Sequence, residues 1–135
     1  MKVFVPDASV ILKWVLSRDE DNKDKAYELL QGWLNEEYEF ILPSLWVYEV
    51  GNVLGLKVPK EAGDILKNLL EYNFNEYQMT EKFLDRVFNL IKQYKGITFY
   101  DAAYHAIALE KNGILITADK AYFKKVKGTS EVMLI

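Results

Sequence analysis

Residues 3–14 of the chain are VFVPDASVILKW, and this stretch predicts how the fold begins. The valines and phenylalanine within residues 2–6 favour a short strand. Pro6 and Asp7 end that strand, and the apolar spacing that follows predicts a helix over residues 9–16. An acidic side chain therefore stands where a strand passes directly into a helix.

The rest of the chain alternates short strand-like runs with helical runs. Further strands are expected over residues 40–42, 75–79, 114–117 and 132–135. Helices are expected over residues 22–34 and 46–56, from Pro59 to residue 70, from the N-cap Thr80 to Gly96, and over residues 100–111. Because strands separated by helices favour right-handed crossovers, we expect an α/β fold with a mostly parallel central sheet and helices on both faces.

Length and composition fit one globular domain over residues 1–135. The chain is 50% hydrophobic and 14% aromatic, which indicates a packed core and excludes a disordered chain. The absence of cysteine excludes a disulfide scaffold, a thiolate metal site and a cysteine nucleophile. No signal-peptide cleavage site follows the first apolar run, and no stretch approaches the ~18 apolar residues of a membrane span. We expect a soluble, cytoplasmic protein without membrane association.

The formal net charge of −3 argues against a passive nucleic-acid coat protein, which would carry a basic surface. It does not argue against an enzyme that acts on nucleic acid. A cluster of carboxylates that holds a divalent metal ion is locally neutral or positive, whatever the formal count.

Two acids are expected at the same edge of the sheet. Asp7 follows the first strand, and Asp119 lies two residues beyond the strand over residues 114–117. Open parallel sheets bind ligands at the carboxyl ends of their strands. These two side chains, from distant parts of the chain, should therefore project toward one place.

Glu49 and Asp101 each interrupt an apolar helical stretch, and no lysine or arginine stands beside them. An ionised carboxylate is rarely buried without a partner, because its lost hydration costs several kcal/mol. Four acids from four segments therefore suggest a shared cation. Oxygen ligands without a histidine–cysteine cluster favour Mg²⁺ or Mn²⁺ over zinc.

Each acid also has an ordinary structural alternative. Asp7 suits a helix N-cap, Asp101 suits the first turn of a helix, and Asp119 suits a turn. Glu49 has the weakest alternative, because its neighbours are bulky and apolar.

Around these acids the chain resembles the PIN-domain family, and in particular the VapC-type toxins of prokaryotic toxin–antitoxin pairs. The matching pieces are VFVPDASVILKW with Asp7, LPSLWVYEVGNVL with Glu49, TFYDAAYHAIALEKNG with Asp101 and ILITADKAYFKKVK with Asp119. Each piece alone is a weak motif. The four together, in this order and over essentially the whole length, make a specific signal.

The resemblance implies a Rossmann-like, three-layer α/β/α sandwich. It implies that Asp7, Glu49, Asp101 and Asp119 are both the catalytic residues and the ligands of Mg²⁺ or Mn²⁺. The expected activity is metal-dependent endoribonuclease cleavage of RNA, as the toxin of a VapBC-type pair. The expected partners are a cognate antitoxin and a second copy of the chain in a homodimer.

Two details of the resemblance concern the surroundings of the acids. Ser9 and Thr117 match family positions that often carry a small hydroxyl residue near the acids. Ala121 stands where some members carry a further acid, which leaves open whether one or two metal ions bind.

Four basic residues are candidates for contacts with the phosphates of RNA. They are Lys13 and Arg18 after the first acid, and Lys120 and Lys124 after the last. For the lysines after the last acid, the alternative is a solvated helix face over a buried Phe123.

Three further residues on expected helices have open roles. His105 suits a general base, but a single histidine on an apolar helix is more often a packed residue. Gly51 and Gly55 would let another backbone approach closely, either inside the domain or at a dimer interface.

Two rival functions are compared with a nuclease: a binding module and a phosphoryl-transfer domain. A catalytically silent PIN-like module would bind RNA or protein, and a metal titration would distinguish it. Receiver domains and haloacid-dehalogenase-type phosphatases also place an aspartate after the first strand. The phosphatases need Asp-x-Asp where this chain has Asp7-Ala8-Ser9, and a receiver needs an acceptor aspartate where this chain has a helical Glu49.

Overall fold

The computed structural model describes residues 1–16 and 21–135. Within them, the strands form one fully parallel sheet in the order β3-β2-β1-β4-β5. The strands are β1 (Val3–Pro6), β2 (Glu39–Pro43), β3 (Asn75–Tyr77), β4 (Ile114–Thr117) and β5 (Val132–Leu134). The first strand of the chain thus lies at the centre of the sheet, with β4 beside it.

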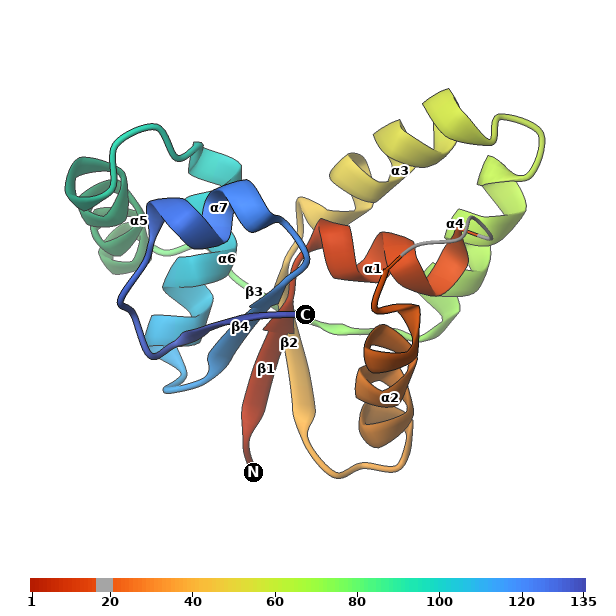
Figure 1. Cartoon of the computed structure of the whole chain (residues 1–135), viewed down its shortest axis with the longest axis horizontal. Helices are drawn as coiled ribbons and strands as arrows, with labels where there is room; N and C mark the ends of the chain where they lie inside the picture. The colour runs from red at the N-terminus through yellow and green to blue at the C-terminus, as the bar shows by residue number, and fades with distance from the viewer. Residues whose placement is uncertain (17–20) are drawn as a thin grey trace.

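Helices cover both faces of the sheet. Figure 1 shows α1 to α4 on one side and α5 to α7 on the other. The helices are α1 (Ala8–Val15), α2 (Lys23–Leu34), α3 (Trp46–Lys57), α4 (Ala62–Glu71), α5 (Glu81–Gln93), α6 (Phe99–Glu110) and α7 (Lys120–Lys125). The predicted three-layer α/β/α sandwich with a parallel central sheet is confirmed.

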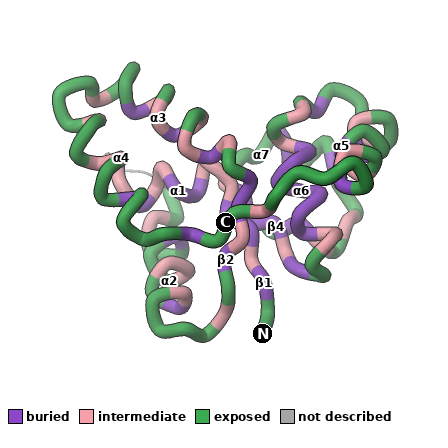
Figure 2. Tube along the Cα trace, turned by 180° about the vertical axis from the view of Figure 1, so that it is seen from behind, coloured by how far each residue is buried: buried purple, intermediate pink, exposed green. Residues whose placement is uncertain are grey.

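Helix α6 lies deepest of the helices on its side, between α5 and the sheet (Figure 2). Every residue from Ala102 to Ala108 is buried, and four of these seven residues are alanine. Small side chains let a helix approach a sheet closely, so the alanines explain how α6 packs directly against β1, β2 and β4. This close packing fixes the helix that carries Asp101.

The other half of the core is aromatic. Trp14 and Trp33 both stack on Phe40 of β2, with ring centroids 5.8 Å and 5.4 Å away. Phe74 adds tilted or edge contacts to both tryptophans and to Trp46 at the start of α3. These large buried rings join α1, α2 and α3 to the sheet.

One glycine is required by close approach. A Cβ atom on Gly113, just before β4, would lie 2.5 Å from the backbone oxygen of Val3. The absence of a side chain here lets β4 pair with β1, and these two strands lead to Asp119 and Asp7.

The prediction that Thr80 caps a helix is confirmed, because Thr80 accepts a hydrogen bond from the backbone N–H of Phe83 at 3.2 Å at the start of α5. The prediction that Gly96 ends this helix was wrong. Helix α5 ends at Gln93, and Gly96, with a left-handed φ of 85°, lies in the segment beyond it. Within the described residues, no helix is both long enough and apolar enough to cross a membrane.

The predicted start of α4 was wrong, because Pro59 does not open this helix, which begins at Ala62. Instead, the Glu61 N–H donates to the Val58 oxygen at 3.1 Å and closes a four-residue turn. Pro59 is the second residue of this turn, a position where turns favour proline.

The sequence predicted α7 only as an alternative, because its six residues are too few for a clear apolar period.

Candidate functional site

The four predicted acids all lie at the carboxyl edge of the parallel sheet. Asp7 joins β1 to α1, and Asp119 lies two residues beyond β4 and caps α7. Glu49 and Asp101 stand in the first turns of α3 and α6. Figure 1 shows the helices α1, α3, α6 and α7 all beginning at this edge of the sheet.

Asp101 is the electrostatic centre of this group. After burial, its negative charge is a further cause of the raised pKa values of Asp7 and of Glu49. The pKa of Asp101 is itself raised by burial and then by the charge of Asp119. The fold therefore brings each of the other three predicted acids within electrostatic reach of Asp101.

The carboxylates line one site but do not meet at one point. Within residues 1–16 and 21–135, no group of three or more histidine, aspartate or glutamate side chains is close enough to hold a metal ion as the side chains stand.

Asp7 has the most strongly shifted pKa of the acids. Burial of the carboxyl raises its pKa to about 6, although hydrogen bonds from Ser9, Thr117 and the Val10 backbone oppose the rise. The Ser9 hydroxyl donates to Oδ1 of Asp7, and the Val10 N–H donates to the same oxygen at 3.3 Å. Asp7 is thus both the N-cap of α1 and a member of the acidic site.

Ser9 and Thr117, predicted from the family resemblance, connect the two turns that carry Asp7 and Asp119. Their hydroxyl oxygens lie 3.5 Å apart. Ser9 Oγ accepts from the backbone N–H of Ala118 at 2.9 Å, and Thr117 Oγ1 accepts from that of Asp119 at 3.0 Å. These bonds hold the end of β1 against the end of β4.

Glu49 is half-buried on α3 and contacts a residue that the sequence interpretation did not single out. The hydroxyl of Tyr104, on α6, donates to Glu49 Oε1 at 2.7 Å. Tyr104 lies three residues after Asp101, so helical periodicity could have placed it on the same side of α6. Its contact with α3 could not be read from sequence spacing.

Asp101 and Asp119 are each tied to a helix start. The Asp101 backbone N–H donates to Thr98 Oγ1 at 3.0 Å, so Thr98 caps α6. Asp119 Oδ1 accepts from the N–H groups of Ala121 and Tyr122 at 2.9 Å and 3.1 Å. The structural alternatives for both acids therefore hold alongside their place in the site.

The basic candidates are placed differently from one another. Lys13, on α1, donates from Nζ to the backbone oxygen of Asp21 at 2.7 Å. Lys120 and Lys124 are exposed on α7. Arg18 lies outside the described residues.

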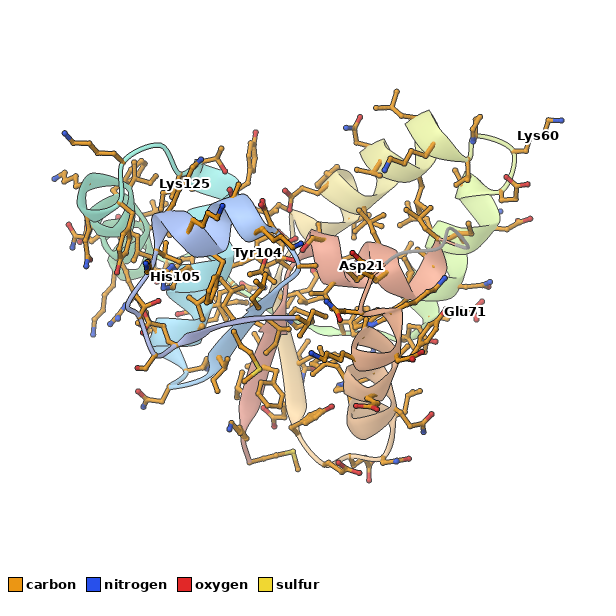
Figure 3. All side chains as sticks on the ribbon, viewed as in Figure 1. Asp21, Lys60, Glu71, Tyr104, His105 and Lys125 are labelled. Carbon is orange, nitrogen blue, oxygen red and sulfur yellow. The ribbon has the colours of Figure 1, made fainter. Side chains whose placement is uncertain are left out.

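Lys125, one of the lysines that follow Asp119, is a basic residue whose charge acts on Asp101. Its charge partly opposes the raised pKa of Asp101. Its Nζ also donates to the backbone oxygen of Gly96 at 2.8 Å, which holds α7 beside the segment before α6. Figure 3 shows Lys125 on α7, above the helix that carries Tyr104 and His105.

His105 is fully buried away from the acids, as the packed alternative predicts. Its Nδ1 lies 2.7 Å from the Tyr122 hydroxyl, and its Nε2 lies 2.9 Å from Glu131 Oε1. The fully buried aromatic residue of α7 is Tyr122, at 3% exposure, while Phe123 is half-buried and packs against the core.

Together these features define a class of protein: a three-layer α/β protein that carries four acids at the carboxyl edge of its parallel sheet. The family model described as PIN domain matches residues 4–128. The chain belongs to the PIN domain family, and the predicted resemblance is confirmed.

Several known proteins are similar to this chain. Exonuclease VapC9 from Pyrobaculum aerophilum is 27% identical over 103 residues, which cover 74% of this chain and 77% of that protein. A toxin–antitoxin complex from Klebsiella pneumoniae contains a chain with a TM-score of 0.69 and 20% identity, covering 98% of this chain and 96% of that chain.

A third similar structure is VapC20 from Mycobacterium tuberculosis, named as a toxin that cleaves the sarcin–ricin loop. Its TM-score is 0.71 at 15% identity, over 97% of this chain and 98% of that one. At these identities, the two structural likenesses establish a shared fold.

Proposed function

We propose that this protein is a VapC-type ribonuclease that depends on a divalent metal ion and acts as the toxin of a toxin–antitoxin pair. The observation that carries the proposal is the position of four acids, from four separate segments, at the carboxyl edge of the sheet. A relative named as an exonuclease and structural neighbours named as toxins support it.

The donor set fits a hard divalent cation. Burial raises the pKa values of Asp7, Glu49 and Asp101, so it disfavours the charged forms of these carboxyl groups. The Arg86–Glu110 ion pair does not involve these acids, and Lys125 only partly opposes the shift of Asp101. A bound cation would stabilise the charged forms, and oxygen donors favour Mg²⁺ or Mn²⁺.

Within this proposal, Asp7, Glu49 and Asp101 are the primary ligands. Asp119, two residues beyond the end of β4, acts through water or on a second cation. Ala121 supplies no further carboxylate, so a second cation would have few ligands. When bound, the cation supplies Lewis-acid activation of water and of the phosphodiester.

The chain's own groups orient the reactants. Ser9 and the Val10 backbone N–H fix Oδ1 of Asp7, and so they orient this carboxylate. Lys125 and the exposed Lys120 and Lys124 place positive charge on the same side of the sheet as Asp101, where they would hold the RNA backbone. RNA preference then depends on contacts and shape, because attack by water needs no 2′-hydroxyl.

The remaining parts of the proposal concern partners and setting. The proposed partners are a cognate antitoxin, as in the toxin–antitoxin complexes of similar fold, and a second copy of this chain in a homodimer. The proposed location is the cytoplasm, where RNA is available. The whole chain, residues 1–135, is proposed to act as one domain.

Hydrolysis of an end-labelled RNA tests the proposal. We expect cleavage with Mg²⁺ or Mn²⁺, none with EDTA, and a loss of at least about 100-fold for Asp7→Asn, since a carboxylate that holds the metal would be removed. Asp85→Asn removes an exposed acid on α5 and is the matched control. Cleavage that persists in EDTA and in Asp7→Asn would end the proposal. Cation binding without cleavage would instead favour a silent RNA- or protein-binding module.

A further inference from the structure

A buried hydroxyl contacts one of the proposed metal ligands. Tyr104 is 1% exposed on α6, and its hydroxyl donates to Oε1 of Glu49 on α3 at 2.7 Å. The two residues are 55 positions apart in sequence and belong to helices on opposite sides of the sheet (Figure 1). The bond therefore joins the two halves of the acidic site.

Glu49 needs such a contact more than the other acids. The Asp7 and Asp119 carboxylates are each held by a backbone N–H at a helix start, and these side chains are short. Glu49 has one more rotatable bond than these aspartates. Within the described part of the chain, its carboxylate accepts a hydrogen bond from Tyr104. Without that hydroxyl, Glu49 would be free to turn toward solvent.

Tyr104 is the donor of this bond, because a phenol has a hydrogen to donate and an ionised carboxylate only accepts. A phenol packed on all sides in the core is also a rigid support, because its ring cannot move without disturbing α6.

We propose that Tyr104 is a positioning residue that fixes the Glu49 carboxylate by its Oε1 atom, so that Oε2 is available to the divalent cation. The inference rests on the proposed function, since it concerns the same acidic site. Groups that orient a metal ligand typically change metal affinity by about 10-fold to 100-fold when they are removed.

The test measures Mn²⁺ binding by the electron paramagnetic resonance signal of free Mn²⁺, using the full chain. Tyr104→Phe keeps the ring and removes the hydroxyl, and we expect it to weaken Mn²⁺ binding by about 10-fold or more. The Mn²⁺ concentration that gives half-maximal RNA cleavage should rise by the same factor, while cleavage at saturating Mn²⁺ recovers. Tyr38→Phe is the matched control, because its hydroxyl donates to the Leu29 oxygen at 2.5 Å, at the start of β2 and away from the acids.

A double-mutant cycle separates positioning from general loss of structure. If Tyr104 acts through Glu49, Tyr104→Phe should have little further effect on Mn²⁺ affinity in a Glu49→Gln background. If Tyr104→Phe does not fold, Glu49→Asp provides the same test, because it withdraws the carboxylate from the hydroxyl and leaves the core intact. We expect a comparable loss of affinity.

The outcomes distinguish the two proposals. Suppose that the wild type binds Mn²⁺ and cleaves RNA. If Tyr104→Phe then binds Mn²⁺ equally well, or if the losses of affinity from Tyr104→Phe and Glu49→Gln simply add, the positioning role is overturned and the proposed function stands. Full Mn²⁺ affinity in Glu49→Asp would likewise overturn it. If the wild type neither binds Mn²⁺ nor cleaves RNA, both proposals fall.

Discussion

Asp7 shows how a single residue can serve both folding and the site. Its carboxylate caps α1 and takes a hydrogen bond from Ser9, yet burial raises its pKa to about 6. A helix cap alone would not explain so strongly disfavoured a charge. We interpret the unfavourable charge as the cost of a site arranged for a cation that the acids share.

This interpretation predicts the effect of Asp7→Asn on stability. The charge of Asp7 destabilises the folded protein above pH 6, and the penalty fades as pH falls from 6 toward 3.8, the ordinary value. Since asparagine is an equally good N-cap, we expect Asp7→Asn to gain on the order of 1–3 kcal/mol at pH 7 in EDTA.

Urea denaturation in EDTA at pH 7 and pH 5 checks this prediction. The gain should shrink at pH 5, where wild-type Asp7 is mostly protonated in the folded state. A variant that is less stable than the wild type at pH 7 would contradict the argument.

At the scale of elements, the site depends on two close contacts between neighbouring elements. One is the approach of β4 to β1 at Gly113, where a Cβ would lie 2.5 Å from the Val3 oxygen. Gly113→Ala should cost about 1–3 kcal/mol, because backbone would have to move. Gly55→Ala is the control, since nothing lies within 4 Å of its Cβ position, and there alanine should stabilise α3 by about 0.5–1 kcal/mol. Thermal denaturation measures the stability of both variants. Equal changes in stability for Gly113→Ala and Gly55→Ala would contradict this role of Gly113.

The second contact is the buried histidine that joins α6 to α7 and to the start of β5. Burial lowers the pKa of His105, so the ring is neutral, with Nε2–H donating to Glu131 and Nδ1 accepting from Tyr122. His105→Ala leaves a cavity and two polar groups without their partner, and we expect a loss of about 2–4 kcal/mol.

His105 should also make the wild type less stable as pH falls below 6.5, because the unfolded chain then takes up a proton that the buried ring resists. Denaturation curves between pH 7 and pH 5 test this by comparing the wild type with His105→Ala. The variant should lack this part of the pH dependence, and an unchanged slope would contradict it.

Sequence reasoning succeeded where a local signal existed. The strands before Asp7 and Asp119 were placed correctly because each is a short apolar run that ends at a polar turn. Thr80 was recognised as a cap from its position before an apolar helical stripe. These signals lie within a few residues of the feature that they predict.

The contacts that depend on three-dimensional packing could not be predicted in this way. The bond between Tyr104 and Glu49 depends on how α6 and α3 lie across the sheet, and Lys125 reaches Gly96 across 29 residues. Tyr122 is the fully buried ring of α7 and contacts His105, and sequence spacing did not reveal this contact.

At the scale of the whole molecule, a cation should stabilise the folded protein, because the acids meet only in that state. Binding at 100 times the dissociation constant adds about 2.7 kcal/mol to the free energy of unfolding. We expect Mn²⁺ to raise the melting temperature of the wild type and to leave that of Asp101→Asn nearly unchanged. The measurement uses Ca²⁺-free buffer, and Asp85→Asn is the control. Equal shifts of the melting temperature in Asp101→Asn and in the wild type would contradict a shared site.

In the proposed function, Asp7, Glu49 and Asp101 share one divalent cation. The anomalous diffraction of a crystal soaked in Mn²⁺, at a concentration that supports RNA cleavage, tests this directly. We expect one strong anomalous peak bounded by these three carboxylates. A crystal with no peak among them, or with Mn²⁺ bound only elsewhere, would contradict it.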